Sequence, residues 1–347
     1  MSYRCALLGC GGRQRSHAKA YGLVTRGKIV AICDMNEKRL NDFGDTFSIK
    51  TRYTNLDEML QKEKPDVVHM TMAPTIRASL MTRLADAGVP GVIVEKPICV
   101  GADDYKALRA LNARSKTKFV VNHQLRHHPK LLELLKYVGE GKIGEVRFID
   151  ASCGLPMAGQ GVHVLDLMFA FNGYAKAKSV FGALSGWEDL KGTHPGPNTA
   201  EYVIGFENGV RGVLQSGPGA PMYDDGADPT WTHYQKRVAV YGTHGFVHWR
   251  MQAWERSLPD GTVERGRKLY PEEDLPGQAG LTNAMFDWLD DGAKVHPNNL
   301  ATSLDEWLVV IAGYASAVRK AAIALPFDPP DDLLDQVKQS VATAPPK

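Results

Sequence analysis

Lys96 stands where the sequence predicts the end of a buried strand. The run Gly91-Val92-Ile93-Val94 is apolar and β-branched, and Glu95-Lys96-Pro97 follows it directly. Such a run is typical of a parallel strand that is buried on both faces. Open α/β sheets bind ligands at the carboxyl ends of their strands, so Lys96 is a candidate for a ligand site. The alternative is a solvated surface lysine, which is the commoner setting for this residue type.

A glycine turn near the start of the chain is a candidate nucleotide site. Gly9-Cys10-Gly11-Gly12-Arg13-Gln14 follows a predicted strand over residues 3–9 and opens a predicted helix over residues 13–21. Gly9 would make the tight turn, and Gly11 would let the backbone approach a pyrophosphate at the N-terminus of the helix. Gln14 replaces the third glycine of the dinucleotide fingerprint, so strand and helix pack less closely there.

Asp34 completes the candidate nucleotide site. It ends the next predicted strand, about 20 residues further on, where a carboxylate can accept hydrogen bonds from the adenosine ribose. Its charge would repel a 2′-phosphate, which favours NAD, although Arg13 and Arg15 can pair with phosphate and leave NADP possible. The alternative is a structural glycine turn with Asp34 as a helix cap. The expected cofactor contacts are Gly9, Gly11, Gly12, Arg13, Gln14, Asp34, Pro74, Glu95 and Lys96.

The elements that must position these residues alternate strand and helix over residues 3–123. Strands are predicted at 3–9, 28–34, 66–70, 91–94 and 118–122, and helices between them. Asn36 can cap one helix, and Gly88 ends another. This alternation predicts a doubly wound parallel sheet, which is a Rossmann domain over residues 1–123.

The pattern changes after about residue 124. Strands at 144–150, 200–206, 209–216 and 237–241 alternate apolar and polar residues, and Asn208-Gly209 is a hairpin signal. Helices are predicted at 129–140, 162–171, 281–291 and 303–321, and the proline-rich tail after Pro326 is expected to be partly irregular. The fold class is therefore α/β, with a C-terminal α+β domain over residues 124–347 that has an open, mainly antiparallel sheet.

The composition restricts the partners. Hydrophobic residues make up 44% of the 347 residues, and the formal net charge is +2. No basic field attracts nucleic acid or a membrane, so small-molecule partners are expected.

The number of cysteines, five, is odd, and none of them form a C-x-x-C pair, which predicts buried free thiols in a reducing compartment. No signal-like segment or membrane-length apolar run occurs, and we expect a cytoplasmic protein. The histidines lack metal-ligand spacing, so no metal site is expected.

The succession of motifs resembles the Gfo/Idh/MocA oxidoreductases. The motifs that carry the resemblance are the glycine turn over residues 9–14, then Glu95-Lys96-Pro97, Arg126-His127-His128-Pro129, Gly141 to Val146, Phe206-Glu207-Asn208-Gly209, Tyr241 to Gly245, and Tyr314-Ala315-Ser316-Ala317. They span nearly the whole chain in the family's order. The resemblance implies a Rossmann domain, an α/β domain with an open sheet, and hydride transfer between NAD(P) and a sugar, inositol or related polyol. It also implies a homodimer or homotetramer that forms through the open sheet.

The resemblance assigns chemistry to two residues. Lys96 matches the family lysine that contacts substrate and nicotinamide ribose. Oxidation of a secondary alcohol needs a proton acceptor and a cation near the developing alkoxide, and Lys96 can supply either. His163 matches the family histidine, and near a helix N-terminus it should stay neutral, as a base requires. Gly159 replaces the aspartate of the family's Asp-x-x-x-His motif. The alternative for His163 is a buried, hydrogen-bonded imidazole.

Further residues are expected at the substrate. Asn122 and His123 follow the last strand of the first domain, Arg126 fits a family arginine, and Asp166 could orient His163 or face the domain interface. The irregular stretch 217–234 includes Tyr234, which could contact a sugar ring, although an oligomer-contact loop is equally compatible. The alternative for Asn122, His123 and Arg126 is packing at the domain linker.

Three functions fit these residues. The leading hypothesis is an NAD-dependent oxidoreductase that acts on a secondary hydroxyl of a sugar, glycoside or inositol-like polyol. The second is a redox-neutral NAD-dependent glycosidase that uses transient C3 oxidation and elimination, which Gly159 suggests. The third is a non-enzymatic NAD-binding sensor, which Lys96 and His163 disfavour.

Overall fold

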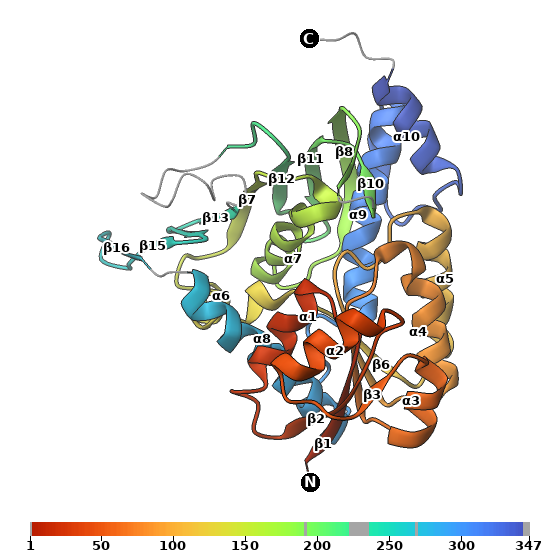
Figure 1. Ribbon diagram of the computed structural model, residues 1–347. Helices are drawn as coiled ribbons and strands as arrows, with labels where there is room; N and C mark the ends of the chain where they lie inside the picture. Colours follow the sequence, from red (N-terminus) through yellow and green to blue (C-terminus); the bar gives the residue numbers. More distant parts are fainter. Residues whose placement is uncertain (1, 191–192, 222–235, 268–269, 343–347) are drawn as a thin grey trace. The chain divides into compact units, whose positions relative to one another are not determined.

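The computed structural model describes residues 2–190, 193–221, 236–267 and 270–342 (Figure 1). The chain forms two compact units. The first contains Met1–Cys99, Lys106–His128 and Glu273–Leu304, and the second contains Val100–Tyr105, Pro129–Glu272 and Asp305–Lys347. The chain thus returns to the first unit late in the sequence. One segment of the first unit ends at His128, close to the expected domain boundary after residue 123. That residues 1–123 and 124–347 are two separate domains stays a prediction.

The first unit is built on a parallel six-stranded sheet in the order β3-β2-β1-β4-β5-β6. Its strands are β1 Tyr3–Leu8, β2 Gly27–Cys33, β3 Arg52–Tyr53, β4 Val67–Met70, β5 Gly91–Val94 and β6 Lys118–Val121. The order reverses between β1 and β4, and this switch point is where doubly wound sheets bind their ligands. The predicted parallel sheet is confirmed, although the sequence analysis missed the short strand β3.

Helices connect these strands. They are α1 Gly12–Ala20, α2 Glu37–Thr46, α3 Leu56–Glu63, the 3₁₀ turn η1 Pro74–Ile76, α4 Arg77–Asp86, α5 Ala102–Arg114 and the 3₁₀ turn η2 Gln124–His127. The Asn36 side chain accepts a hydrogen bond from the Arg39 backbone and caps α2, as the sequence predicts. Gly88, with φ of 74°, lies just beyond α4, where a left-handed residue ends a helix.

A helix from late in the sequence completes the first unit. The helix α8, Tyr270–Asp290, packs Leu281, Met285 and Phe286 into a core cluster with Val67, Ile93 and Val120 of the sheet. A Cβ atom at Gly27 would lie 2.6 Å from the Phe286 ring, so glycine permits the close approach at this edge. The helix therefore carries residues more than 150 positions away in sequence to the same core as β5 and β6.

The second unit contains a nine-stranded sheet in the order β16-β15-β14-β13-β7-β12-β11-β8-β17. Only the β7–β12 pair among its described strands is parallel, so the predicted mainly antiparallel sheet is confirmed. The strands are β7 Val146–Cys153, β8 Ala177–Ser185, β11 Thr199–Phe206, β12 Arg211–Ser216, β13 Lys236–Gly242, β14 Phe246–Arg250, β15 Ala253–Ser257, β16 Val263–Arg267 and β17 Ile323–Ala324, and β9 Glu188–Leu190 pairs separately with β10 His194–Gly196.

The helices of this unit are α6 Pro129–Gly139, the π-helical turn η3 Met157–Gly161, α7 Val162–Phe171, α9 Leu300–Arg319, which begins in the first unit, and α10 Leu333–Ala342. Helix α7 matches its predicted bounds. The tail after Pro326, expected to be partly irregular, begins without regular structure and then forms α10, whose Leu333 and Val337 are buried on one face.

The two faces of the nine-stranded sheet differ in burial. One face is apolar and buried, with Phe169 of α7 in edge-to-face contact with Phe206 and Gly313 of α9 directly against Tyr202. The other face exposes Phe181, Val203 and Tyr241. All five cysteines of the chain are buried free thiols, as predicted. Among the described helices, none combines the length and apolar character that crossing a membrane requires.

Candidate cofactor and active site

The glycine turn after β1 has the geometry that a dinucleotide phosphate needs. Gly9 has φ of 89°, and a Cβ atom there would lie 2.9 Å from Met72 Sδ, so glycine is required on both counts. At Gly11 and Gly12 an added Cβ would meet no atom within 4 Å, which leaves open space beside the backbone. No side chain caps the N-terminus of α1 within the described part of the chain. Its first backbone N–H groups therefore suit an anion.

Gln14, in the third fingerprint position, is fully buried. Neither polar atom of its side-chain amide has a hydrogen-bonding partner among the described residues. A buried amide of this kind is costly unless a ligand or water satisfies it. Together with the open turn, Gln14 shows that the residues present fit a bound dinucleotide.

Asp34 follows β2 at the same edge of the sheet and accepts four hydrogen bonds. Its Oδ2 accepts from Cys10 N at 2.8 Å and Arg39 Nε at 2.7 Å, and its Oδ1 accepts from Asn36 N at 2.9 Å and Arg39 Nη2 at 2.8 Å. Burial alone would raise the pKa of Asp34, but these hydrogen bonds together lower it. Asp34 is therefore an ionised carboxylate whose most exposed partner is the Arg39 guanidinium, with 52% of the Arg39 side chain accessible.

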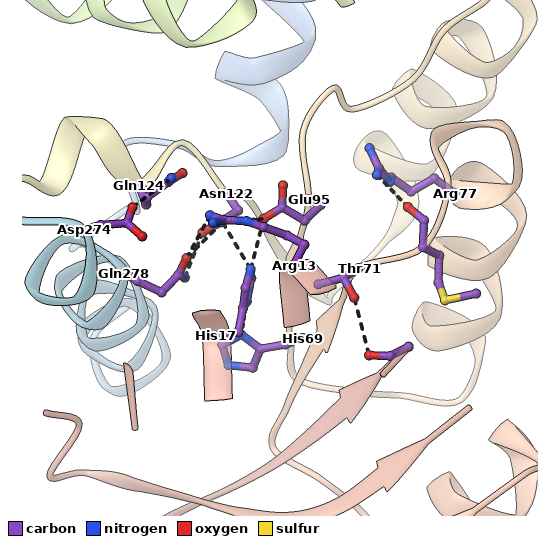
Figure 2. Close-up of polar contacts among 12 residues, drawn as sticks. Arg13, His17, His69, Thr71, Arg77, Glu95, Asn122, Gln124, Asp274 and Gln278 are labelled. Carbon is purple, nitrogen blue, oxygen red and sulfur yellow. Dashed lines mark hydrogen bonds and ion pairs between the residues drawn. The ribbon is translucent and has the colours of Figure 1, made fainter. Parts of the chain in front are cut away.

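Glu95, which follows β5, lies at the centre of a buried polar network (Figure 2). Its Oε1 accepts from Arg13 Nε at 2.6 Å, from Asn122 Nδ2 at 2.7 Å and from the His17 ring at 3.0 Å. Burial would raise the pKa of Glu95, but the charge of Arg13, the His17 hydrogen bond and the charge of Lys96 hold it well below its usual range. Glu95 is therefore a buried carboxylate.

Helix α8 contributes to this network through Gln278. Gln278 Nε2 donates to Asn122 Oδ1 at 2.9 Å, and Asn122 Nδ2 is 3.1 Å from Gln278 Oε1, so the two amides pair reciprocally. Arg13 Nη2 also donates to Gln278 Oε1 at 3.3 Å. Asn122, predicted to contact substrate, thus has both ends of its amide engaged by the protein. Arg13, predicted to pair with phosphate, is directed to Glu95 instead.

Lys96 follows Glu95, and the Lys96–Pro97 peptide bond is cis. The fully buried Arg77 donates to the carbonyl oxygens of Pro97 and Met72, which ties this turn to the segment after β4. His123 is buried nearby, where burial and then the charge of Lys96 lower its pKa to about 3. His123 is therefore neutral, and its electrostatic coupling to Lys96 indicates that β5 and β6 bring these two predicted residues together.

Pro74 and Arg126, the remaining predicted residues of the first unit, lie on turns that follow strand ends. Pro74 is buried and begins η1, shortly after β4. Arg126 is half-buried in η2, after β6. The carboxyl edge of one parallel sheet thus carries the glycine turn, Asp34, Pro74, Glu95, Lys96, Asn122 and His123, as the alternation of strands predicts.

The predicted residues of the second unit lie on and before α7. His163 and Asp166 are both buried on α7. The π-helical turn Met157–Gly161 runs directly into this helix, and His163 is the second residue of α7. That the helix N-terminus keeps His163 neutral stays a prediction. Gly159 lies inside this turn, and Tyr234 lies outside the described residues.

Sequence reasoning missed four residues of the Glu95 network and its support: His17, His69, Arg77 and Gln278. His69 did leave a signal, because a histidine inside Val67-Val68-His69-Met70 is a polar residue in a buried strand. Gln278 left none, since its contact with Asn122 joins residues 156 positions apart. No group of three or more His, Cys, Asp or Glu side chains in the described ranges could hold a metal ion.

Comparison with known proteins agrees with this geometry. Residues 3–123 match the family model of the oxidoreductase family with an NAD-binding Rossmann fold. Inositol 2-dehydrogenase from Rhizobium meliloti is 24% identical over 334 residues, covering 93% of this chain and 98% of that protein. D-apiose dehydrogenase from Paraburkholderia graminis is 28% identical over 234 residues, covering 61% of this chain and 60% of that protein.

Solved structures share the fold over both units. An oxidoreductase from Agrobacterium radiobacter in complex with NAD⁺, L-tartaric acid and magnesium superposes with a TM-score of 0.78 at 19% identity, covering 93% of this chain and 98% of that one. Levoglucosan dehydrogenase in complex with NADH and levoglucosan gives 0.80 at 16% identity, with 94% and 100% covered. The fold and the glycine turn thus define a Rossmann-type, NAD-dependent oxidoreductase. Within that class, residues 3–123 match the Gfo/Idh/MocA family model, and the similarity to inositol 2-dehydrogenase extends over 93% of the chain.

Proposed function

We propose that this protein oxidises a secondary hydroxyl of a sugar, glycoside or inositol-like polyol with NAD. The observation that carries the proposal is Lys96, placed at the carboxyl edge of the parallel sheet beside a buried, ionised Glu95. Bound NAD would supply the hydride acceptor. The names of the relatives support the substrate class, since inositol 2-dehydrogenase, D-apiose dehydrogenase and levoglucosan dehydrogenase all act on polyhydroxylated rings or sugars.

In this proposal the Lys96 ammonium first releases its proton to solvent, and the neutral amine then accepts the proton of the hydroxyl group as the carbon loses its hydride. The ammonium group that forms then stabilises the oxygen of the product carbonyl. His163 is proposed as a second proton-transfer or substrate-positioning residue, and Asp166 as its neighbour on α7. Asn122 would act indirectly, by holding Glu95, because its own amide is bonded within the first unit.

The test is a spectrophotometric assay of the protein with NAD and a panel of sugars, glycosides and inositols. NADH absorbance should appear with at least one of them. With that substrate, Lys96→Met should lower kcat by about 10³-fold, the usual range for loss of an acid–base group. Lys19→Met, which changes an exposed lysine on α1, serves as the control and should keep full activity. Absence of turnover across the whole panel, or an active Lys96→Met variant, would overturn the proposal.

A redox-neutral glycosidase is the second candidate. Gly159 favours it, because glycine stands where many relatives have the aspartate that precedes the histidine, and here that glycine is part of a π-helical turn. Transient oxidation at C3 would make the neighbouring proton acidic, and elimination would then release the aglycone. Release of nitrophenol from a nitrophenyl glycoside without net NADH would identify this activity, whereas stoichiometric NADH would exclude it for that substrate.

We also propose a homodimer or homotetramer that forms through the open face of the nine-stranded sheet. Val203 pairs with Phe181 of β8, and Tyr241 pairs with Phe148 of β7. The registers through Val213 of β12 put both pairs on one face of the sheet. Their exposure in a single chain supports burial against a second copy. A cytoplasmic location is proposed from the five buried free thiols. Light scattering of the protein, compared with a Phe181→Glu/Val203→Glu variant, tests the assembly.

A further inference from the structure

Two fully buried histidines of the first unit have no part in the proposed chemistry. His69 lies in β4 opposite Leu7 and Ile93, and His17 lies in α1. Their Nδ1 atoms are 3.0 Å apart, and their rings are almost perpendicular, at 88°. Buried imidazoles are costly unless both ring nitrogens have partners. The partners on their other sides therefore matter.

Those partners extend the pair into a chain. His69 Nε2 is 2.8 Å from the Tyr21 hydroxyl, and His17 Nε2 is 3.0 Å from Glu95 Oε1. Three hydrogen bonds thus lead from Tyr21, at the end of α1, through both rings to the carboxylate that precedes Lys96. Figure 2 shows the part of this chain that includes His69, His17 and Glu95.

Chemistry fixes where the protons lie. The Glu95 carboxylate can only accept, so His17 Nε2 must donate to it. A neutral His17 ring then accepts at Nδ1, so His69 Nδ1 donates, and His69 Nε2 accepts from the Tyr21 hydroxyl. Every donor in the chain therefore points toward Glu95. Asn122 is compatible with this, because its amide hydrogens are directed to Glu95 Oε1 and Gln278 Oε1.

The charges around the chain keep both rings neutral. Burial is the largest effect on His17 and lowers its pKa; Glu95 and Asp274 oppose this, and Arg13 reinforces it. Burial and the neighbouring His17 hold the pKa of His69 well below its usual range. At the far end, burial and Cys5 keep the pKa of the Tyr21 hydroxyl well above its usual range, so it remains a donor.

We propose that His69 and His17 are positioning residues for Lys96. The chain fixes His17 as an Nε2–H donor, that donor helps hold Glu95 Oε1, and Glu95 is bonded directly to Lys96 in sequence. In the other tautomer, the His17 lone pair would face the carboxylate and repel it. As an imidazolium, His17 would add a positive charge beside Lys96. The functional part of this inference rests on the proposed role of Lys96, whereas the tautomers do not.

Histidine ¹⁵N NMR tests the chain without any substrate. We expect His69 in the Nδ1–H tautomer and His17 in the Nε2–H tautomer, both neutral from mildly acidic to mildly alkaline pH. The variants His17→Asn and His69→Gln assign the two rings among the 11 histidines. An imidazolium at either position, or His69 in the Nε2–H tautomer, would overturn the proposal.

A matched histidine pair provides the control for activity. His296 is buried in the same unit, 5.3 Å from the His127 ring centroid, and is bonded to the Leu281 carbonyl rather than to Glu95. His69→Leu should lower kcat about tenfold, as a displaced catalytic group does, with the KM for NAD almost unchanged. It should also introduce a new ionisation into the pH profile of kcat, because His17 loses its Nδ1 donor. His296→Gln should lower stability but leave kcat and its pH profile unchanged.

The outcomes separate this proposal from the proposed function. If His69→Leu and His296→Gln change kcat equally, the histidine chain is only structural and the inference fails. If Lys96→Met remains active, the proposed function fails whatever the tautomers are. If His69→Leu does not fold, Tyr21→Phe removes a single hydroxyl from the chain, and it should still alter the His69 ¹⁵N shifts and lower kcat severalfold. Unchanged shifts and unchanged kcat in that variant would likewise overturn the inference.

Discussion

Asp34 and Glu95 are two carboxylates at the same edge of the same sheet, and the protein holds them in different ways. Asp34 is bonded by backbone N–H groups and by Arg39, five residues away and half exposed. Glu95 is bonded by His17 and Asn122, which are fully buried and distant in sequence, and by Arg13, whose side chain is 32% exposed. The partners of Asp34 lie within 24 positions of it, whereas Glu95 has two partners in the buried core of the unit.

This difference indicates which carboxylate can exchange partners when the cofactor binds. A ribose hydroxyl that approaches Asp34 can displace the half-exposed Arg39, because Asp34 keeps its hydrogen bonds from Cys10 N and Asn36 N. Displacing His17 or Asn122 from Glu95 would leave buried polar groups without partners. We therefore expect Asp34 to contact the cofactor directly and Glu95 to act through Lys96.

The largest predicted effect is on stability, from Glu95→Leu. The change leaves the Arg13 charge and the His17 and Asn122 donors without their acceptor, and removal of one buried partner should cost about 3 kcal/mol of unfolding free energy. Urea unfolding measures it. As the control, Glu58→Leu breaks an exposed pair with Lys62 and should change the unfolding free energy by less than about 0.5 kcal/mol. If the two variants lose the same unfolding free energy, the buried hydrogen bonds of Glu95 contribute no more than an exposed ion pair, which would contradict the account.

Next in size is the cofactor preference of Asp34→Asn. Removal of this charge removes the repulsion of a 2′-phosphate and releases Arg39 to pair with it. The ratio of the NADP and NAD dissociation constants should fall at least about tenfold, which is about 1.4 kcal/mol. Titration with each reduced cofactor, followed by fluorescence, gives the ratio. The double variant Asp34→Asn/Arg39→Ala should lose most of the gain, and a gain that persists there would show that Arg39 has no part in it.

Arg39→Ala tests the competition between Arg39 and the cofactor for Asp34, and its expected effect on binding is smaller. Arg39 competes with the ribose for Asp34, so its removal should lower the dissociation constant for NAD by about threefold, under 1 kcal/mol. The dissociation constant for NADP should rise, because Asp34 is then unshielded. Calorimetric titration of both cofactors measures the two changes. Weaker binding of NAD by this variant would mean that Arg39 contacts the cofactor rather than blocking it.

The smallest effect is confined to acidic pH. Both carboxylates have pKa values that folding lowers, so each stabilises the fold above its unfolded pKa, near 4, and loses that contribution as pH falls through its folded pKa. Unfolding free energy should therefore fall below about pH 4 in the wild type. The fall should be shallower in Asp34→Asn. Parallel pH curves for the two proteins would contradict the lowered pKa of Asp34.

The two carboxylates also show what the sequence can predict. The Asp34 site depends on local order: a glycine turn, a strand, an acid and a capping asparagine, all within residues 3–36. Sequence analysis located it for that reason. Lys96 was also predictable, because the β-branched run before it indicates a buried strand. The environment of Glu95 instead depends on α8, which contributes Gln278 from 156 positions beyond Asn122, and no local pattern encodes that contact.

The same distinction applies at α7. The helix bounds were predictable from its apolar run, but the π-helical turn before it has no distinct sequence signal in Met157-Ala158-Gly159-Gln160-Gly161. The strands β14 to β16 were missed. Val247 and Trp249 of β14 are buried and alternate with partly exposed residues, but that pattern is only five residues long, and β16 has no buried residue.

Direct observation of hydride transfer tests the central claim, that this edge of the sheet supports oxidation of a sugar or polyol hydroxyl by NAD. A substrate found in the panel would be prepared with deuterium on the carbon that bears the reacting hydroxyl and mixed with NAD and excess protein. The account predicts that mass spectrometry finds NADH carrying that deuterium, and that Lys96→Met forms it about 10³-fold more slowly. Oxidised product with no deuterium in the cofactor would contradict the account.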